Sequence, residues 1–342
     1  MQTSALRSLL TIPGPFVSVY FDDSHHPEDA EKQLDLKLRE LRGELSAQDT
    51  PEDSLAAIEN SARGRSRTVG RGGRALIAAG GHVVVDEELT EPPATHVARV
   101  SALPYLVPLV RYGEPPLRHV VAAVDRAEST IDAFDEHGRR TESETVRGRG
   151  HPVHDYLTEI TDTVAKAAER TGARLVVLVG GVRARTAVHS ALPDSVRAIT
   201  HEATHESAVE DLVEGAKHRR LADLDARYRT ELSRGRGLAT EGLAGVATAL
   251  READVEVLIV GNPGDSTVFT VDDPGDDPRM VAASERELEA IGTGKGIEKG
   301  IERVRERRAD EAIPFAAIAA DAEIVALTGL LDGGFGAILR HG

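Results

Sequence analysis

Two glycines, two arginines and two histidines stand close together in residues 146–154, which read VRGRGHPVH. A guanidinium pairs with phosphate through a planar fork of donors, and an imidazole binds metal ions or moves protons near neutral pH. The GRG at 148–150 is too short for the dinucleotide fingerprint, which needs G-x-G-x-x-G directly after a strand. The residue types therefore allow a phosphate contact, a metal pair, a catalytic loop or a plain connection.

A second group of arginines lies in residues 62–74, ARGRSRTVGRGGR, which contain no acidic residue. Its members are Arg63, Arg65, Arg67, Arg71 and Arg74. The whole chain has a formal net charge of −16, which opposes diffuse binding to nucleic acid. A local basic patch still lets an acidic protein contact RNA. Both an RNA contact and a solvated loop remain open for this segment.

His201, Glu202 and His205 match H-E-x-x-H, in which zinc peptidases present both histidines on one helix with the glutamate as general base. The match follows a strand-like VRAIT and precedes a helical pattern that starts near Ser207. We therefore favour a strand-to-helix loop over a zinc site. The chain has no cysteine, so a metal would depend on histidines and carboxylates alone, and we expect no cofactor.

The elements that must position these residues alternate between strand and helix patterns, which predicts an α/β fold. We expect three α/β domains in tandem, at residues 1–115, 116–236 and 237–342, with breaks at the GEPP and GRG sequences. LVVLV at 175–179 and VEVLIV at 255–260 have the continuous apolar character of buried strands. We also expect strands at 105–112 and 196–200, and a charged helix at 297–309.

No run of residues approaches the eighteen apolar positions of a membrane-spanning helix, and the first ten residues are too polar for a signal peptide. These features predict a cytoplasmic protein.

Four segments resemble, in the same order, the archaeal and eukaryotic class-one release factor superfamily, which includes Pelota. Residues 175–192 (LVVLVGGVRARTAVHSAL) and 214–232 resemble a strand, turn and helix of the middle domain and its exit helix. Residues 242–260 (GLAGVATALREADVEVLIV) and 322–341 resemble the opening and the end of the C-terminal domain. The resemblance spans residues 119–341, roughly two thirds of the chain. It implies that the middle and C-terminal domains are release-factor-like.

The superfamily's hydrolytic loop ends in Gly-Gly-Gln, and its codon-reading domain carries an Asn-Ile-Lys-Ser loop and a cysteine. Here the glutamines are Gln2, Gln33 and Gln48, outside the middle domain, and the asparagines are Asn60 and Asn262. Residues 146–154 stand in the place of the hydrolytic loop but are far shorter. This departure resembles the bacterial branch of the superfamily, the Balon-like ribosome hibernation factors.

The resemblance implies a ribosome-associated factor that binds the A site in translational stress, hibernation or rescue, without reading codons and without hydrolysing the peptidyl ester. Ribosomal RNA of the decoding region is the expected partner of the five arginines at 63–74. RNA near the peptidyl-transferase centre is expected to contact Arg147, Gly148, Arg149, Gly150, His151 and His154. An elongation-factor-type GTPase is a further expected partner.

Two alternatives remain open. One is a peptidyl-tRNA hydrolase in which His151 or His154 positions water. The other is a zinc hydrolase built on His201 and His205.

Overall fold

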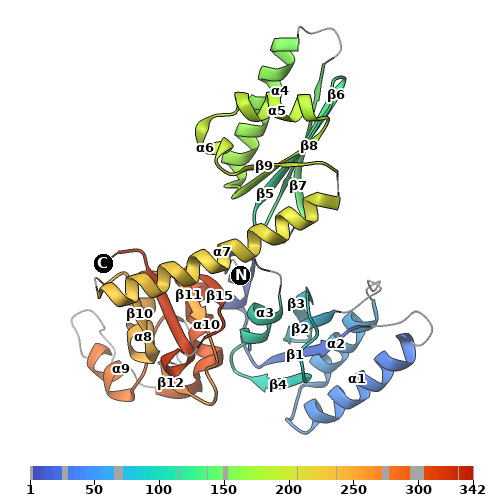
Figure 1. Ribbon diagram of the computed structural model, residues 1–342. Coiled ribbons are helices and arrows are strands. Elements are labelled where there is room, and N and C mark those ends of the chain that lie inside the picture. Colours follow the sequence, from blue (N-terminus) through green and yellow to red (C-terminus); the bar gives the residue numbers. More distant parts are fainter. Residues whose placement is uncertain are drawn as a thin grey trace. The chain divides into compact units, whose positions relative to one another are not determined.

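The computed structural model describes residues 3–24, 30–64, 72–113, 115, 117–136, 138–148, 153–205, 207–235, 237–271, 277–292, 304–329 and 331–341. It confirms the expected α/β class (Figure 1). The chain forms two compact units. Unit 1 combines Met1–Glu114 with Ala226–Gly342, and unit 2 is Pro115–Asp225. The division into domains at 1–115, 116–236 and 237–342 stays a prediction.

The N-terminal part of unit 1 is a four-stranded antiparallel sheet in the order β3-β2-β1-β4. Its elements are η1 (Thr3–Thr11), β1 (Phe16–Asp22), α1 (Ala30–Ser46), α2 (Glu52–Gly64), β2 (Gly73–Ala79), β3 (His82–Leu89), β4 (Val97–Ser101) and α3 (Val107–Tyr112). Gly80 and Gly81 join β2 to β3 with φ of 55° and 75°, left-handed values that glycine adopts without strain.

The strand β1 is buried on both faces, because alternate residues enter two different cores. Val17, Val19 and Phe21 pack with leucines of α1 and α2. Phe16 and Tyr20 belong to a second core that also contains buried residues of the C-terminal part of the chain. The FVSVYF run is therefore apolar throughout instead of alternating.

The expected strand at 105–112 is wrong, since Val107–Tyr112 is the short helix α3. Pro108 lies in its first turn, where a missing N–H costs no hydrogen bond and the fixed φ suits a helix. The Arg111 guanidinium donates to the carbonyl of Gly261, 2.7 Å away. The helix thus joins the two chain segments of unit 1.

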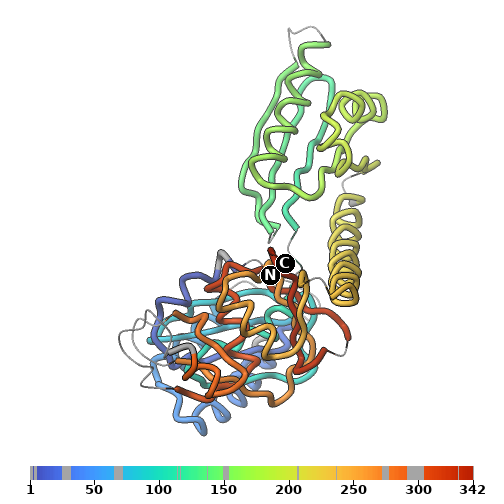
Figure 2. The backbone as a smooth tube through the Cα atoms, turned by 90° about the vertical axis from the view of Figure 1, so that its left-hand side faces the viewer, coloured from blue at the N-terminus to red at the C-terminus, as the bar shows by residue number. Residues whose placement is uncertain are grey.

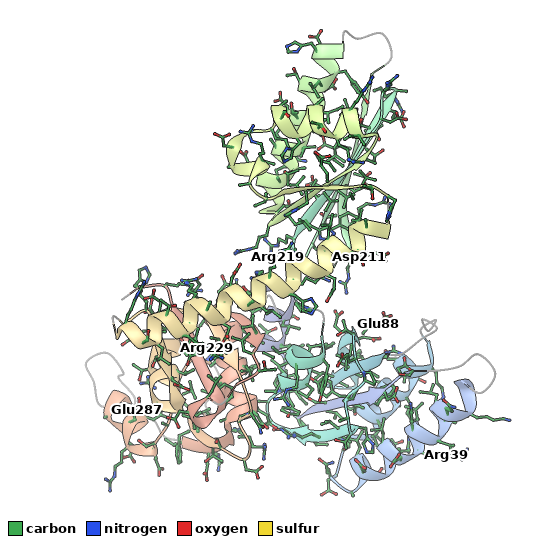
Figure 3. All side chains as sticks on the ribbon, in the orientation of Figure 1. Arg39, Glu88, Asp211, Arg219, Arg229 and Glu287 are labelled. Atoms are coloured by element: carbon green, nitrogen blue, oxygen red, sulfur yellow. The ribbon has the colours of Figure 1, made fainter. Side chains whose placement is uncertain are left out.

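The C-terminal part of unit 1 contains the sheets β10-β16-β11-β15 and β13-β12-β14. Its strands are β10 (Ala239–Glu241), β11 (Val255–Val260), β12 (Thr267–Val271), β13 (Val281–Ala282), β14 (Val304–Arg308), β15 (Glu323–Ala326) and β16 (Phe335–Leu339). Its helices are α8 (Gly242–Arg251), α9 (Glu285–Gly292), α10 (Ala309–Ala319) and η2 (Asp332–Gly334). Glu287 of α9, labelled in Figure 3, accepts a hydrogen bond from Arg251 of α8.

The expected charged helix at 297–309 is wrong where the structure describes it. Val304–Arg308 is the strand β14, which pairs antiparallel with β12, and a helix begins only at Ala309. Two of its charged residues have partners at or beside β12, since Glu306 accepts from Thr267 at 2.7 Å and Arg308 donates to Asp265 at 3.0 Å.

Buried charges join β4 to α10 inside unit 1. Arg99 Nη1 lies 3.2 Å from Asp310 Oδ2 and 3.1 Å from Glu311 Oε1. Both carboxylate residues are 2% exposed, and Arg308 gives Asp310 a second partner at 2.8 Å. Burial of two carboxylates is tolerated only with such partners.

Unit 2 is built on a five-stranded sheet in the order β7-β6-β5-β8-β9, in which β5, β8 and β9 are parallel and β6 and β7 antiparallel to their neighbours. Its strands are β5 (His119–Val124), β6 (Glu128–Phe134), β7 (Arg140–Arg147), β8 (Leu175–Gly180) and β9 (Thr200–Ala203). Its helices are α4 (Val153–Thr171), α5 (Val182–Ala191), α6 (Asp194–Arg197) and the first part of α7 (Ser207–Arg234).

Helices cover both faces of this sheet. Residues of α4 and α5 form one core with Val120, Ala122 and Leu178, and α4 runs along the strands (Figure 2). The start of α7 covers the other face, where Val209, Leu212 and Val213 meet the alternate residues of β8. The expected strand at 196–200 is shifted, because Val196 is buried within α6 and the strand β9 begins at Thr200.

Among the described residues, no helix is both long enough and apolar enough to cross a membrane.

Candidate functional site

Arg63 lies at the end of α2 with its side chain 48% exposed. Its Nη2 is 2.9 Å from Asp35 Oδ1 of α1, an ion pair open to solvent. Arg65, Arg67 and Arg71 lie outside the described residues. Of the five arginines predicted to contact RNA, the structure therefore describes two. Arg63 lies at the surface and Arg74 is buried.

Arg74 is buried, and its prediction as an RNA contact is wrong. The residue is 2% exposed on β2. Its guanidinium forms a fork with Asp86, Nε to Oδ1 at 2.9 Å and Nη2 to Oδ2 at 2.8 Å. It also donates to the carbonyls of Ala62 and Ser61, at the end of α2. Arg74 thus ties α2 to the hairpin β2–β3, and its guanidinium is buried out of reach of a phosphate in solution.

The tract at 146–154 connects β7 to α4 in unit 2. Arg147 ends β7 with its side chain 78% exposed, and its Nε lies 3.1 Å from Glu128 Oε2. Arg149, Gly150 and His151 lie outside the described residues. An exposed ion pair of this kind contributes little to stability, so that Arg147 can exchange Glu128 for a phosphate at small cost.

Gly148 has a packing role. Its N–H donates to the carbonyl of Ala127 at 2.9 Å. A Cβ added at this position would lie 2.9 Å from the carbonyl oxygen of Arg126 and 3.0 Å from the ring of Tyr156. Glycine is therefore required for the backbone to approach these two residues. These packing contacts account for the glycine without a bound ligand.

His154 lies in the first turn of α4 and is exposed. Its carbonyl accepts from Thr158 Oγ1 at 2.9 Å, as in a helix. Within the described ranges, the side chains close enough together to hold a metal are Glu40, Glu44 and His96, a surface group that does not include His154. His96 is already bonded to Glu44 at 2.7 Å.

The H-E-x-x-H residues do not share a helical turn. His201 and Glu202 are consecutive residues of the strand β9, so their side chains point to opposite faces of the sheet. Glu202 Oε2 accepts from Arg185 Nε at 3.2 Å. His205 lies before α7, where its Nδ1 accepts from the N–H of Ala208 at 3.2 Å. The arrangement that a zinc peptidase needs is therefore not formed, and a strand-to-helix connection is what the structure contains.

Two residues that the sequence did not single out hold the end of this tract. Tyr156 of α4 meets Gly148, and its hydroxyl is bonded to Ser129 Oγ at 2.8 Å and to the carbonyl of Asp125 at 2.9 Å. Arg126 begins the turn after β5. The sequence did contain a signal for a site at this end of the sheet. Residues 125–126 and 181–183 follow two buried strands, and ligands of open α/β sheets bind at the carboxyl ends of parallel strands.

Comparison with known proteins gives a family match in the same part of the chain. The sequence model described as bacterial archaeo-eukaryotic release factor family 2 matches residues 155–236. An uncharacterised protein of Mycobacterium tuberculosis, found in two strains, is 34% identical over 378 residues, covering 100% of this chain and 97% of the relative.

Solved Pelota structures align with nearly the whole chain at low identity and low TM-score. Pelota of Archaeoglobus fulgidus is 10% identical, with 99% of this chain and 92% of that chain covered and a TM-score of 0.33. Archaeal Pelota bound to a ribosome with ABCE1 is 12% identical, with 99% and 93% covered and a TM-score of 0.38. With TM-scores this low, the superpositions do not identify a binding partner for any residue of this chain.

Proposed function

Because the chain belongs to the bacterial branch of the archaeo-eukaryotic release factor superfamily, we propose that it is a ribosome-associated factor of translational stress, hibernation or rescue. It would bind the A site without reading a codon and without hydrolysing the peptidyl ester. Three functional domains, at 1–115, 116–236 and 237–342, are part of this proposal. The observation that carries it is the tract at 146–154, which has two arginines and no glutamine where the hydrolytic loop of the superfamily would stand.

The charges of the described residues support an RNA contact at this tract. Arg147 is exposed and held only by a solvent-open pair with Glu128. The neighbouring Arg126 is exposed, and no ion pair of its guanidinium occurs among the described residues. Two exposed guanidinium groups at one end of a sheet, one of them held only by a solvent-open pair, are suited to phosphate, since each can donate in a fixed fork. Arg149 and His151 belong to the proposal by their place in the sequence.

The proposed partners are the RNA of the decoding region and of the peptidyl-transferase centre. The proposed contacts of the decoding-region RNA are Arg63, Arg65, Arg67 and Arg71. Arg74 is not among them, because it is buried. An elongation-factor-type GTPase is proposed as a partner of residues 237–342 on the family resemblance alone. The family assignment makes the ribosome the partner to test first.

Sedimentation of lysate from stationary cells on a sucrose gradient tests ribosome association directly. The tagged full chain is expected in the ribosomal fractions at low salt. Protein that stays at the top of the gradient under every growth and salt condition would refute the proposal.

Neutral substitutions of Arg147 and Arg149 test the contact. Each phosphate contact that is lost lowers the slope of log affinity against log salt by about one. Arg147→Ala with Arg149→Ala is expected to weaken ribosome binding and to lower this slope. The matched control is Arg174→Ala. It removes an exposed arginine directly before β8, at the end of the sheet opposite to the tract. An effect of the double change that is only twice that of the control would mean that net charge alone is acting.

Peptidyl-tRNA on stalled ribosomes tests the hydrolase alternative. We expect no release of peptide by the full chain. Release that His151→Ala or His154→Ala abolishes would replace the non-hydrolytic proposal by the hydrolase.

A further inference from the structure

A cavity of about 440 Å³ in unit 2 is lined by residues of α4 and α5 and by residues at the carboxyl end of β5, which is parallel to β8. Figure 1 labels these helices and strands. This volume falls within the ~300–1,000 Å³ of pockets that bind small molecules. The carboxyl ends of parallel strands are where open α/β sheets bind their ligands. The wall is apolar and buried at Val124, Ile160 and Val188.

The cavity is held open by two contacts that fix its walls. Gly180 ends β8 with a φ of 129°, and a Cβ there would lie 2.1 Å from the carbonyl oxygen of Val124. This close approach sets where α5 begins relative to β5. On the α4 side, Tyr156 is fixed by its hydrogen bonds to Ser129 and to the carbonyl of Asp125. Both contacts are made within the chain itself and need no ligand.

Charged groups lie at the rim. Arg126 and Arg183 line the cavity and are exposed, and among the described residues neither guanidinium has an ion-pair partner. Asp125 stands beside them, with Oδ1 accepting the N–H of Arg126 at 2.6 Å. Its second oxygen accepts no hydrogen bond from the described residues. The rim thus offers two cations for phosphate and one acceptor for an amino group.

We propose that this cavity binds one unpaired nucleotide of an RNA. The base enters between Leu157 and Ala187 against the aliphatic floor, since every base has a flat face that stacks on apolar side chains or guanidinium planes. The phosphate is held by Arg126 and Arg183. Asp125 accepts from an exocyclic amino group, as carboxylates do with cytosine N4, so that cytosine is preferred to uracil.

The inference rests on the proposed function for the source of the RNA, because a ribosome-bound protein meets unpaired nucleotides of ribosomal RNA and transfer RNA. The cavity adds to that proposal a defined binding space whose lining side chains the structure describes. It does not depend on Arg149, Gly150 or His151.

Titration of the methyl-labelled full chain with CMP, followed by NMR, tests the cavity without ribosomes. The methyl signals of Val124, Leu157, Ile160 and Val188 are expected to shift, with a Kd in about the millimolar range for a single nucleotide. UMP should bind more weakly than CMP. Ribose 5-phosphate should leave the methyl signals of the cavity floor in place, because it has no base to insert.

Two kinds of variant separate the walls from the rim. Ala187→Phe fills the cavity from an exposed position of α5 and is expected to abolish the shifts. Arg126→Ala with Arg183→Ala leaves the cavity open and is expected to weaken CMP binding about tenfold, as loss of charge-assisted hydrogen bonds does. Arg174→Ala, at the other end of β8, should leave the affinity unchanged. Unmoved floor signals at saturating CMP, or shifts that survive Ala187→Phe, would overturn the assignment.

Ribosome sedimentation of the same variants tells the two proposals apart. Floor signals that shift with CMP in a protein that never enters ribosomal fractions would keep the nucleotide site and reject the ribosome. Ribosome binding that does not respond to any of these variants, together with no CMP binding, would reject the site and keep the ribosome. Ribosome binding lost in Ala187→Phe without any nucleotide binding would show a protein segment as the occupant, and would also overturn the nucleotide assignment.

Discussion

Arg74 shows how a residue's surroundings decide the meaning of its type. In the sequence it stands with four other arginines and reads as a phosphate contact. In the structure its guanidinium makes a fork with Asp86 and reaches two carbonyls at the end of α2. Its role is to satisfy buried acceptors, and substitution should therefore act on stability.

Arg74→Ala is expected to lower the free energy of unfolding by about 3–5 kcal/mol, because it removes a buried guanidinium together with its fork to Asp86 and its hydrogen bonds to two carbonyls, while Asp86 keeps the hydrogen bond from Ser61 Oγ. Urea denaturation followed by circular dichroism measures this. Arg63→Ala is the control, since its exposed pair with Asp35 should contribute at most about 1 kcal/mol. A stable Arg74→Ala variant with weakened ribosome binding would restore the RNA interpretation.

His119 makes unit 2 sensitive to acid. Burial lowers its pKa from the usual 6.5, and its ring stacks on Phe134 with centroids 4.7 Å apart. Nδ1 is 3.0 Å from the carbonyl of Leu117, and the nearby Asp135 opposes the shift. A histidine that is neutral when folded is protonated more readily when unfolded. Its contribution is therefore complete above the unfolded pKa and decreases as the pH falls below about 6.5.

His119→Gln should remove this part of the pH dependence. We expect the variant to be less stable than the wild type near pH 7.5, with a difference that shrinks as the pH is lowered to about 5.5. Urea midpoints at a series of pH values measure it. A stability difference that is constant across this range would show that His119 has the same pKa in both states.

At the scale of elements, the turn between β8 and α5 requires glycine at position 180 but not at position 181. Gly180→Ser places a Cβ against the carbonyl of Val124 at a φ that other residues rarely adopt. We expect it to lose about 2 kcal/mol or more of stability and to disturb the cavity. Gly181→Ser is the matched control, because Gly181 caps α5 with extended backbone and open space, where serine is favoured. Equal losses in the two variants, by thermal unfolding, would contradict this explanation.

The same turn marks what the sequence could reveal about elements. LVVLV and VEVLIV were recognisable as buried strands, since both are continuous apolar runs, and the start of α7 was recognisable from the helical pattern near Ser207. Residues 105–112 and 304–308 were assigned wrongly, because short segments take their conformation from partners distant in the chain. Pairing with β12 makes 304–308 a strand, although its spacing of charges also fits a helix.

The candidate site was less predictable for the same reason. Arg147, Gly148 and His154 were found by their types, but a type does not tell whether a side chain faces solvent or a core. Arg126, Tyr156 and Arg183 come from three elements and meet only through the sheet. Nothing local in the sequence brings them together, although the places of Arg126 and Arg183 after the parallel strands β5 and β8 were visible.

At the scale of the molecule, the net charge of −16 limits how RNA can be bound. The exposed arginines of the described residues are mostly neutralised by carboxylates, as Arg170 is by Glu142 and Glu144. RNA affinity must therefore come from a few local guanidinium groups, and it should fall with salt by the small number of contacts that these can make.

The two segments of unit 1 share one hydrophobic core, which has a consequence for how the chain can be divided. Leu6, Leu9 and Tyr20 belong to the same cluster as Ile318 and Phe335, which follow unit 2 in the sequence. Arg99 of the first segment also neutralises Asp310 and Glu311 of the second. Residues 1–114 alone would expose this apolar face and would lose these partners. Unit 2 instead has its own cores on both faces of its sheet.

We therefore expect residues 115–225 to fold when expressed alone, whereas residues 1–114 should lack a cooperative unfolding transition. Co-expression of 1–114 with 226–342 should restore that transition and give a stable complex of the two fragments. Circular dichroism during heating and size-exclusion chromatography measure these outcomes. Residues 1–114 that unfold cooperatively by themselves, as stably as with their complement, would mean that the shared core contributes little. In that case the N-terminal segment would be an independent domain, as the division at residue 115 predicts.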